Sequence, residues 1–418
     1  MKKINISVIG LGYVGLPLAL AFGKYFNTIG YDINKDRIKY LKKNIDKNNE
    51  TNKIDFKKSK NIYFTYDHNQ ISISNIYVIT VPTPIYKNKK PDYRILKNAC
   101  EIVGKFLKKN DIVIFESTVY PGMTEDICVP ILIKNSRLNY KKDFSVGYSP
   151  ERINPGDKKR KLENIPKLVS ASDNKSLNII SYLYSKIINA KIHKIESIKI
   201  AEAAKIIENT QRDINIAFIN ELSIIFNKLN IDTYKVLKAA NTKWNFLNFQ
   251  PGLVGGHCIG VDPYYLTYIA KKNGYNTKII LSGRELNDNM YKEVTKKIFK
   301  QIKIQKLNKN LKILIMGYTF KENCSDVRNS QIIKIKKLIS KYYHTDIYDP
   351  HIYNDMKDKK LNVIKYPKKN YYDVILLAVN HEIFLKLGIR KILKFAKKNR
   401  IIFDIKNMFP EYKKSISL

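Results

Sequence analysis

The sequence has few cysteines, and their arrangement does not fit a metal site or a disulfide framework. Four cysteines occur in 418 residues, at Cys100, Cys128, Cys258 and Cys324. They form no CxxC pair and have no His/Cys ligand spacing, which argues against structural zinc and against a fold held by disulfides. An isolated cysteine is usually a small buried hydrophobic residue. We therefore predict no metal site and expect Cys100, Cys128 and Cys324 to be buried.

The sequence also lacks long apolar runs and a recognisable secretory leader. No stretch approaches the ~20 consecutive apolar residues that a membrane-spanning helix needs. The opening "MKKINISVIGLGYVG" contains two lysines, but glycine breaks its apolar run and no small-residue cleavage site follows. We therefore expect a soluble, cytoplasmic protein with no membrane span.

Acidic residues are scarce relative to basic ones. The 37 Asp and Glu residues are outnumbered by 76 Lys and Arg, which gives a formal net charge of +39. Such an excess would ordinarily suggest nucleic acid or an anionic membrane as a partner. However, the lysines are spread along the whole chain among Ile, Asn and Tyr, a mixture that fits codon bias in an AT-rich genome equally well. Because no arginine-rich arm, RNA-binding aromatic motif or zinc knuckle is present, we predict no nucleic-acid partner, although a polyanionic substrate would be attracted.

The first third of the chain alternates strand-like apolar runs with helix-forming segments. The strand-like runs are "KINISVI" (3–9), "TIGYDI" (28–33), "IYVITVPTP" (76–84), "DIVIFESTVYPG" (111–122) and "FSVGYSPERINPG" (144–156). Strands that alternate with helices predict a parallel, doubly wound sheet.

The pattern changes at residue 197 and restarts near residue 310. Residues 197–230 contain no proline or glycine and are apolar around most of the circumference, which predicts a long, largely buried helix that joins two domains. Further strand-like runs occur at 311–316, 345–350, 372–379 and 400–407. The predicted fold class is α/β, with two Rossmann-like doubly wound domains joined by a long central helix. The predicted division is 1–192, 193–302 and 303–418.

A glycine motif follows the first predicted strand. Gly10 permits a tight turn, Gly12 lets the backbone approach a pyrophosphate, and Gly15 lets the next helix pack on the strand. The helix N-terminus offers free N–H groups and a positive dipole to phosphate. Asp32 ends the next strand at about the spacing expected for a carboxylate that binds the ribose 2′-OH and repels a 2′-phosphate. The motif predicts NAD rather than NADP; the alternative is a glycine turn followed by a surface aspartate.

Two residue pairs suggest catalytic chemistry. Lys205 and Asn209 are four residues apart on the long predicted helix, so both project from one face. A lysine in this apolar setting needs a polar partner; the alternative is a lysine that reaches solvent beside a capping asparagine. Cys258 lies in a glycine turn whose N–H groups can lower the pKa of its thiol, and Asp262 follows four residues later. A thiolate beside NAD could capture an aldehyde as a thiohemiacetal. Loss of a hydride from that adduct gives a thioester, which water hydrolyses to the acid.

Seven motifs together carry a resemblance that runs nearly end to end. They are "GLGYVGLPLA" (10–19), "TVPTP" (80–84), "ESTVYPGMTE" (116–125), "GYSPERINPGD" (147–157), "AEAAKIIENTQRDINIA" (201–217), "GLVGGHCIGVDPYYL" (252–266) and "GYTFKENCSDVRNS" (317–330). With these motifs the chain resembles the UDP-glucose/GDP-mannose dehydrogenase family of nucleotide-sugar 6-dehydrogenases. It is most similar to the branch that acts on UDP-N-acetylglucosamine or UDP-N-acetylgalactosamine in Vi-antigen, O-antigen and capsule synthesis.

The branch is identified from residues beside the cysteine. The UDP-glucose branch typically has Ser before this cysteine and Lys–Asp in the loop after it, whereas this chain has His257 and Val261–Asp262. The segments "STVYPG" and "GYSPERINPGD" favour N-acetylglucosamine or N-acetylgalactosamine over N-acetylmannosamine.

The resemblance implies an NAD-dependent enzyme that oxidises C6 of the sugar from alcohol to carboxylate with two NAD per turnover. It implies an N-terminal NAD domain, a central helix that helps to form a homodimer, and a C-terminal UDP-binding domain. The catalytic residues implied are Cys258 as nucleophile, Lys205 and Asn209 as the pair that steadies the oxyanion, and Thr118, Glu151 and Asp262 as groups that position and activate water. The cofactor-binding residues implied are Gly10, Gly12, Tyr13, Val14, Gly15, Asp32, Arg37, Thr83, Thr118 and Arg328. The substrate-binding residues implied are Glu151, Arg152, Lys205, Asn209, Arg212, Gly255, His257 and Lys321.

One segment departs from the family pattern. Relatives usually read "FLPFRPG", whereas this chain reads "FLNFQPG", with Asn248 and Gln250. Loss of an arginine that can reach the substrate predicts a raised KM.

Other functions stay open at this point. They include a UDP-N-acetylmannosamine, UDP-glucose or GDP-mannose dehydrogenase, and an inactive basic binding protein, although the intact catalytic positions speak against the last. Simple β-hydroxyacid dehydrogenases share the glycine motif and a helix lysine, but they need no cysteine and transfer two electrons rather than four.

Overall fold

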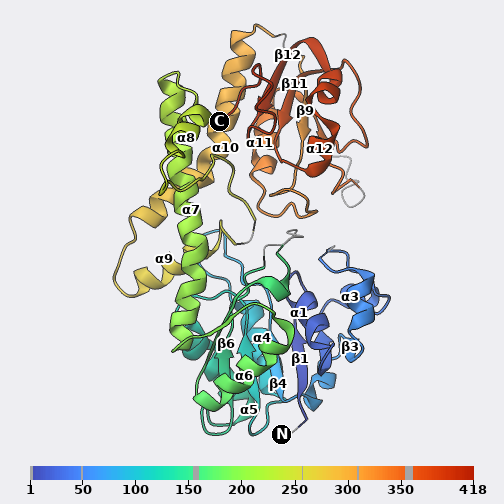
Figure 1. The fold of residues 1–418 in the computed structure, drawn as a ribbon, viewed down its shortest axis with the longest axis vertical. Helices are drawn as coiled ribbons and strands as arrows, with labels where there is room; N and C mark the ends of the chain where they lie inside the picture. The colour runs from blue at the N-terminus through green and yellow to red at the C-terminus, as the bar shows by residue number, and fades with distance from the viewer. Residues whose placement is uncertain (1–2, 49, 154–159, 257, 308–309, 354–360) are drawn as a thin grey trace. The chain divides into compact units, whose positions relative to one another are not determined.

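The chain divides into two compact units, each built on its own sheet (Figure 1). The computed structural model describes residues 3–48, 50–153, 160–256, 258–307, 310–353 and 361–418. One unit consists of Met1–Glu208 and Tyr264–Tyr275, and the other of Asn209–Pro263 and Asn276–Leu418. In the described parts of the chain, no helix combines the length and the apolar character needed to traverse a lipid bilayer.

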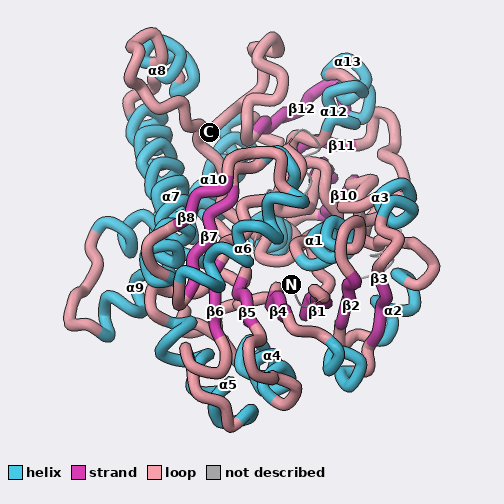
Figure 2. Tube along the Cα trace, turned by 60° about the horizontal axis from the view of Figure 1, so that its bottom comes forward, coloured by secondary structure: helices cyan, strands magenta, loops and turns pink. Residues whose placement is uncertain are grey.

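The first unit is built on a sheet that, in the described residues, has eight strands in the order β3-β2-β1-β4-β5-β6-β7-β8 (Figure 2). The strands are β1 Asn5–Ile9, β2 Asn27–Tyr31, β3 Ile62–Thr65, β4 Ile76–Ile79, β5 Ile112–Phe115, β6 Ser145–Tyr148, β7 Lys167–Ala171 and β8 Ile192–Lys194. The strand order reverses between β1 and β4, the kind of switch point at which open α/β sheets bind ligands. The predicted doubly wound sheet is confirmed.

One strand departs from the parallel arrangement. β7 pairs antiparallel with β6, through Gly147 with Ala171 and Tyr148 with Ser170. Nothing in the sequence pattern predicts β7, which places Lys167 at its first position.

Helices cover the strands of the first unit. They are α1 Gly15–Phe22, α2 Lys35–Leu41, α3 Lys53–Lys58, α4 Arg94–Gly104, α5 Val129–Ser136 and α6 Asn174–Ile187, with short η1 His68–Ile73, η2 Thr124–Cys128 and η3 Leu162–Asn164. α1 is buried along nearly its whole length because almost every side chain in it is apolar. It shares one core with α6, where the rings of Phe22 and Tyr184 meet edge-on with centroids 5.6 Å apart.

The predicted long helix is present as α7, Ile198–Lys228. It is followed by α8 Thr233–Ala240, α9 Asp262–Lys272 and α10 Ile279–Ile304. In the second unit, α7 and α10 are joined by a buried polar network. The Arg284 guanidinium donates to Asp213 at 2.5 Å, and Asn287 donates to the same carboxylate at 2.8 Å. A buried carboxylate is costly unless it is paired in this way, so the network fixes how the two helices pack.

The second unit contains a parallel sheet in the order β10-β9-β11-β12. Its elements are β9 Lys312–Met316, α11 Gln331–Ile339, β10 His344–Tyr348, β11 Tyr372–Leu377, α12 Glu382–Leu387, α13 Ile389–Ile392, η5 Leu393–Phe395 and β12 Ala396–Asp404. Side chains alternate along β9, so Ile313 and Ile315 enter one core while Leu314 and Met316 enter the other. This second α/β sheet confirms the predicted fold class.

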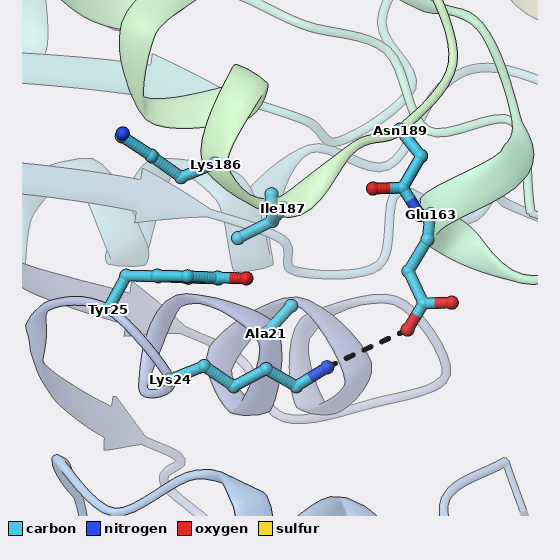
Figure 3. A pocket seen from close by; sticks show the side chains of 7 residues that line it. All are labelled: Ala21, Lys24, Tyr25, Glu163, Lys186, Ile187 and Asn189. Atoms are coloured by element: carbon cyan, nitrogen blue, oxygen red, sulfur yellow. Dashed lines mark ion pairs between the residues drawn. The ribbon is translucent and has the colours of Figure 1, made fainter.

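A pocket of ≈ 100 Å³ lies on the first unit beside the end of α1 (Figure 3). Its lining includes Lys24 and Tyr25 from the turn after α1 and Lys186 and Ile187 from the end of α6. The Lys24 ammonium lies 3.6 Å from the Glu163 carboxylate. None of the residues predicted for catalysis or binding lines it.

Candidate active site

The glycine turn between β1 and α1 has the shape that a pyrophosphate requires. Gly10 adopts φ 93°, and a Cβ added at Gly15 would overlap the Gly10 carbonyl oxygen. Gly12 is exposed, and a Cβ there would meet nothing within 4 Å. Val14 occupies the N-cap position of α1 without a side-chain hydrogen bond, and Tyr13 beside it is half-buried. Inside α1 the Leu16 and Leu18 N–H groups already donate to the Gly12 and Val14 carbonyls, so it is the open turn ahead of the helix that a phosphate would approach.

Asp32 is hydrogen-bonded to the backbone of this turn. One oxygen of its carboxylate accepts a 2.8 Å hydrogen bond from the Leu11 N–H, and the other accepts one of 2.9 Å from the Asn34 N–H. These two donors hold the carboxylate at the end of β2, where a ribose would lie in a dinucleotide site. Sequence spacing therefore identified a residue that the fold does bring to the glycine turn.

Arg37 is also tied to the turn. Its Nε donates to the Leu11 carbonyl at 2.9 Å, and Nη1 donates to the buried Asp46 carboxylate at 2.7 Å. Nη2 is buried and has no hydrogen-bond partner within the described part of the chain. The Asp32 carboxylate, the open Gly12 and a helix start without a side-chain cap together fit an adenine dinucleotide.

The loops after β4 and β5 bring Thr83 and Thr118 together. The Thr83 hydroxyl donates to the Thr118 carbonyl at 2.7 Å, and both side chains are half-buried. The chain beyond Thr118 is held by Glu202 on α7, whose carboxylate accepts from the N–H groups of Gly122 at 2.5 Å and Thr124 at 2.9 Å. Burial raises the pKa of Glu202 to about 7. The sequence does not identify Glu202 as a site residue, because nothing in its spacing points to a loop 80 residues earlier.

Glu151 lies after β6 and is almost fully buried. Oε1 accepts from the N–H groups of Arg152 and Ile153 at 2.5 Å each, and Oε2 lies 3.3 Å from the Lys167 ammonium. Burial alone would raise the pKa of Glu151, but Lys167 and the two N–H donors outweigh it, so this pKa lies below its ordinary value. Arg152, predicted to bind substrate, donates to the Pro166 carbonyl and to Glu208 on α7.

Asn209 and Asp262 meet beside the cysteine turn. The Asn209 side-chain amide donates to the Asp262 carboxylate at 2.6 Å, and both residues are buried. The Asp262 N–H donates to the Cys258 carbonyl at 2.8 Å, which places the cysteine one turn before α9. Cys258 is exposed, whereas Cys100, Cys128 and Cys324 are buried as predicted. The structure thus brings three of the predicted catalytic positions together.

Lys205 lies one helical turn before Asn209 on α7 and is only 8% exposed. Among the residues that the structure describes, its ammonium makes no hydrogen bond or ion pair. Arg212, predicted to bind substrate, is exposed on the same helix. His257 lies outside the described residues, so its predicted contact with substrate stays a prediction.

The segment before Cys258 packs on the loop that follows β9. Gly256 adopts φ 82° and presses against the Phe320 ring, while a Cβ at Gly255 would meet the Asn329 carbonyl at 2.9 Å. Gln331 donates to the Val254 carbonyl at 2.7 Å. These close approaches explain why glycines flank the cysteine.

The same loop after β9 presents the two predicted C-terminal binding residues. Lys321 is half-exposed beside the Phe320 ring, and Arg328 is exposed and forms a two-point contact with Asp326, with its Nη2 at 2.8 Å. Asp349 and His381, which the sequence analysis missed, hold the base of the loop. Asp349 accepts from the Tyr318 N–H at 2.7 Å and contacts the His381 ring at 3.2 Å.

The departure at Asn248 and Gln250 lies on the surface. The Gln250 amide donates to the Asn248 side chain at 3.0 Å, so the two substituted residues bind one another. In the described residues, no three His, Cys, Asp or Glu side chains gather as a metal site would require.

Comparison with known proteins identifies the same architecture along the whole chain. Models of the UDP-glucose/GDP-mannose dehydrogenase family match residues 4–188 with its NAD binding domain, 199–289 with its central domain and 314–411 with its UDP binding domain.

Two curated relatives are similar over their full length. The UDP-N-acetyl-D-glucosamine 6-dehydrogenase of Salmonella typhi is 49% identical over 100% of this chain and 99% of its own. The enzyme of the same name from Pseudomonas aeruginosa is 47% identical over 100% of both chains. Among solved structures, the UDP-D-ManNAc dehydrogenase of Pyrococcus horikoshii has a TM-score of 0.87 at 27% identity, covering 99% of this chain and 98% of that one.

Proposed function

This chain belongs to the UDP-glucose/GDP-mannose dehydrogenase family of NAD-dependent oxidoreductases, and we propose that it oxidises C6 of a UDP-N-acetylhexosamine to the uronic acid. The proposed substrate is UDP-N-acetylglucosamine or its galacto epimer. The observation that carries this choice is the near-50% identity, over the whole chain, to two UDP-N-acetyl-D-glucosamine 6-dehydrogenases. The identity to the N-acetylmannosamine enzyme of known structure is much lower, at 27%.

The overall reaction removes four electrons from one carbon. One alcohol, one water and two NAD⁺ give one carboxylate, two NADH and three protons. Bound NAD supplies the hydride acceptor for both oxidations. The glycine turn, Asp32 and Arg37 would hold its adenosine and pyrophosphate, and Thr83 and Thr118 would line its path toward the substrate.

Cys258 is the proposed nucleophile. Its thiolate adds to C6 of the aldehyde left by the first oxidation and forms a thiohemiacetal, whose C6 hydride leaves in the second oxidation. The resulting thioester is attacked by water, which releases the uronic acid and returns the thiolate. The exposed cysteine in a turn fixed to Asp262 supports this role.

Lys205 and Asn209 are proposed to stabilise negative charge on the C6 oxygen. A buried ammonium with no partner among the described residues costs free energy, which an approaching alkoxide or oxyanion would offset. Asn209 is already oriented by its bond to Asp262. Thr118, Glu151 and Asp262 are proposed to position and activate the water that attacks the thioester.

The remaining substrate contacts are proposed from the family pattern. Arg152, Arg212, Gly255, His257 and Lys321 would contact the nucleotide sugar, and Arg328 the cofactor. The three-part division at 1–192, 193–302 and 303–418 is retained as part of this proposal.

A homodimer is part of the proposal. On α7 the exposed apolar side chains are Ile200, Ile207, Phe218 and Ile225. Their spacings of seven, eleven and seven residues place them on one face of a straight helix. A second copy of the same face would remove this stripe from water. Cytoplasmic location is also proposed, because NAD and nucleotide sugars are metabolites of that compartment.

The decisive experiment measures NADH produced per mole of limiting sugar nucleotide. Covalent capture predicts about two NADH per UDP-N-acetylhexosamine and no aldehyde trapped by added hydroxylamine. A yield near one, with a trapped oxime, would contradict the thioester route.

The same assay with a panel of UDP-sugars tests the substrate. UDP-N-acetylglucosamine and UDP-N-acetylgalactosamine should give higher kcat/KM than UDP-glucose or UDP-N-acetylmannosamine. Faster turnover of UDP-glucose would overturn the substrate assignment without affecting the mechanism.

A further inference from the structure

A buried lysine lies behind Glu151 and belongs to none of the motifs singled out in the sequence. Lys167 is the first residue of β7, the strand that runs antiparallel to its neighbour, and it is 2% exposed. Its ammonium lies 2.7 Å from Glu116 Oε2, 3.1 Å from the Pro150 carbonyl and 3.3 Å from Glu151 Oε2. An ammonium has three protons, so these three acceptors use all of them.

From this geometry we propose that Lys167 is a positioning residue for thioester hydrolysis: its ammonium holds Glu151 in place as a carboxylate and bridges it to Glu116. This role rests on the proposed role of Glu151. It adds the residue that orients the Glu151 side chain and keeps its carboxyl group ionised.

The placement of the two Glu151 oxygens supports this role. Oε1 is held by two backbone N–H groups and Oε2 by Lys167, so the side chain has little freedom to rotate. A carboxylate oxygen offers more than one lone pair. Oε2 therefore keeps an acceptor site for a water molecule after Lys167 has bound.

The charges of the cluster indicate which carboxyl is protonated. Two carboxylates share one ammonium, so full ionisation would leave an uncompensated negative charge in a buried site. Burial raises the pKa of Glu116 to about 7, while the pKa of Glu151 is held below its ordinary value by Lys167 and its backbone donors, against the effect of burial. Near neutral pH Glu151 is therefore the ionised carboxylate, and Glu116 is the carboxyl group that takes up a proton.

The neighbouring groups keep this division. Tyr184 on α6 donates its hydroxyl to Glu116, and burial raises the pKa of Tyr184, so it acts as a neutral donor. The Tyr184 ring lies 5.2 Å from the Lys167 ammonium. On the other side of Glu151, the Arg152 guanidinium pairs with Glu208 of α7 and is engaged there. No other titratable side chain among the described residues makes a hydrogen bond or ion pair to the cluster.

A purely structural role explains these contacts less well. A buried ion triad contributes little net stability, since desolvation opposes the attraction, and apolar residues of similar volume often serve as well. A cluster that orients a carboxylate at the edge of the site has a chemical reason to be ionic.

The test compares Lys167→Met with wild type and with Lys297→Met. Lys297 is a part-buried lysine on α10 that donates to the Ser417 carbonyl, outside the proposed site. Removing the ammonium should raise the pKa of Glu151 by ~1–3 units and shift the acid limb of the kcat profile to higher pH by that amount. At neutral pH, turnover should fall by ~10²-fold, the usual contribution of a general base. Lys297→Met should match wild type.

Identifying which step of the reaction is slowed distinguishes a positioning role from a general loss of structure. Lys167→Met should still release a burst of two NADH per active site, and mass spectrometry of the quenched protein should find the acyl group on Cys258. Lys167→Arg, which keeps the charge, should restore part of the turnover. A slowed variant that shows no burst and no acyl adduct would overturn the inference, as would an unshifted acid limb.

A second variant keeps the inference testable if Lys167→Met does not fold. Glu116→Gln removes the competing negative charge, so the acid limb should move to lower pH, opposite to the shift from Lys167→Met. An upward shift would overturn the inference. Glu151→Gln distinguishes this result from failure of the proposed function: if it leaves turnover intact and accumulates no acyl-enzyme, the role given to Glu151 is itself wrong. If Glu151→Gln accumulates acyl-enzyme while Lys167→Met behaves as wild type, only the role of Lys167 is wrong.

Discussion

The side-chain amide of Asn209 donates a 2.6 Å hydrogen bond to the carboxylate of Asp262, 53 residues later in the sequence. Both residues are buried, and the Asp262 N–H in turn donates to the Cys258 carbonyl. One amide thus connects α7 to the first residue of α9 and, through the backbone, to the turn that carries the exposed cysteine. This hydrogen bond therefore helps to fix the turn that carries Cys258.

Replacing Asn209 by Asp should therefore impair activity in a pH-dependent way. Two carboxyl groups at this distance cannot both ionise, so one would hold a proton with a raised pKa. We expect kcat to fall strongly at neutral pH and to recover in part toward acid pH, because protonation restores a donor to Asp262. A pH profile of kcat checks this. A uniform loss at every pH would instead indicate that the amide itself contacts the substrate.

Cys258→Ser should stop net formation of acid while preserving binding of NAD and sugar nucleotide. An alcohol is a far weaker nucleophile near neutral pH, and the ester it would form hydrolyses more slowly than a thioester. NADH assays with titration calorimetry of both ligands test this expectation. Cys100→Ala, which removes a fully buried thiol elsewhere in the same chain, is the control and should keep the wild-type kcat. Full turnover by the serine variant would exclude Cys258 as nucleophile.

Asp32→Asn should weaken the preference for NAD. Loss of charge-assisted hydrogen bonds to a ribose costs ~1.5–3 kcal/mol, and therefore about tenfold or more in kcat/KM for NAD. The penalty on NADP should shrink, because its 2′-phosphate would no longer meet a carboxylate. Asp36, an exposed acid in the first turn of α2, supplies the matched variant Asp36→Asn, which should leave both values unchanged. An unchanged NAD/NADP ratio in Asp32→Asn would place the ribose elsewhere.

Glu202 should make the protein less stable as the pH rises. Its pKa is about 7 in the folded chain against an ordinary 4.5, so the native state binds its proton more tightly than the unfolded state. The associated stabilisation is complete below the ordinary pKa and is lost as the pH rises through the folded value, a change of roughly 3 kcal/mol.

Urea midpoints at pH 5 and pH 8 measure this effect. Wild type should lose more stability between the two pH values than Glu202→Gln, in which position 202 does not titrate. Other carboxyl groups titrate in both proteins and cancel in the difference. Equal losses would show that Glu202 is ionised throughout.

The sequence predicted those parts of the site that are local in the chain. The glycine turn and Asp32 follow from strand–turn–helix spacing, and the turn that carries Cys258 follows from the glycines around it. The two sheets follow from the alternation of strands with helices. In each case the interacting groups come from one or two neighbouring elements. A short sequence pattern is therefore enough to predict that they lie together.

Other parts could not be predicted because their partners are distant in sequence. Glu116, Lys167 and Tyr184 come from the end of β5, the start of β7 and the middle of α6, and nothing in their spacing marks them as a cluster. Without the fold, Lys167 is one lysine among many. The motif alone predicts that Arg152 binds the substrate, whereas in the fold its guanidinium bonds Glu208 on α7, 56 residues later.

The glycine turn distinguishes residues needed for the protein itself from residues needed for its ligand. A methyl group at Gly15 would overlap the Gly10 carbonyl and crowd the Thr80 hydroxyl, while one at Gly12 would enter empty space. A survey of variants scored by abundance alone would therefore find Gly15 intolerant and Gly12 tolerant. The same survey scored by NADH formation would find both intolerant, because both positions are needed for the bound cofactor. A position that tolerates a methyl group for abundance but not for activity would therefore mark where the phosphate binds, without any bound nucleotide.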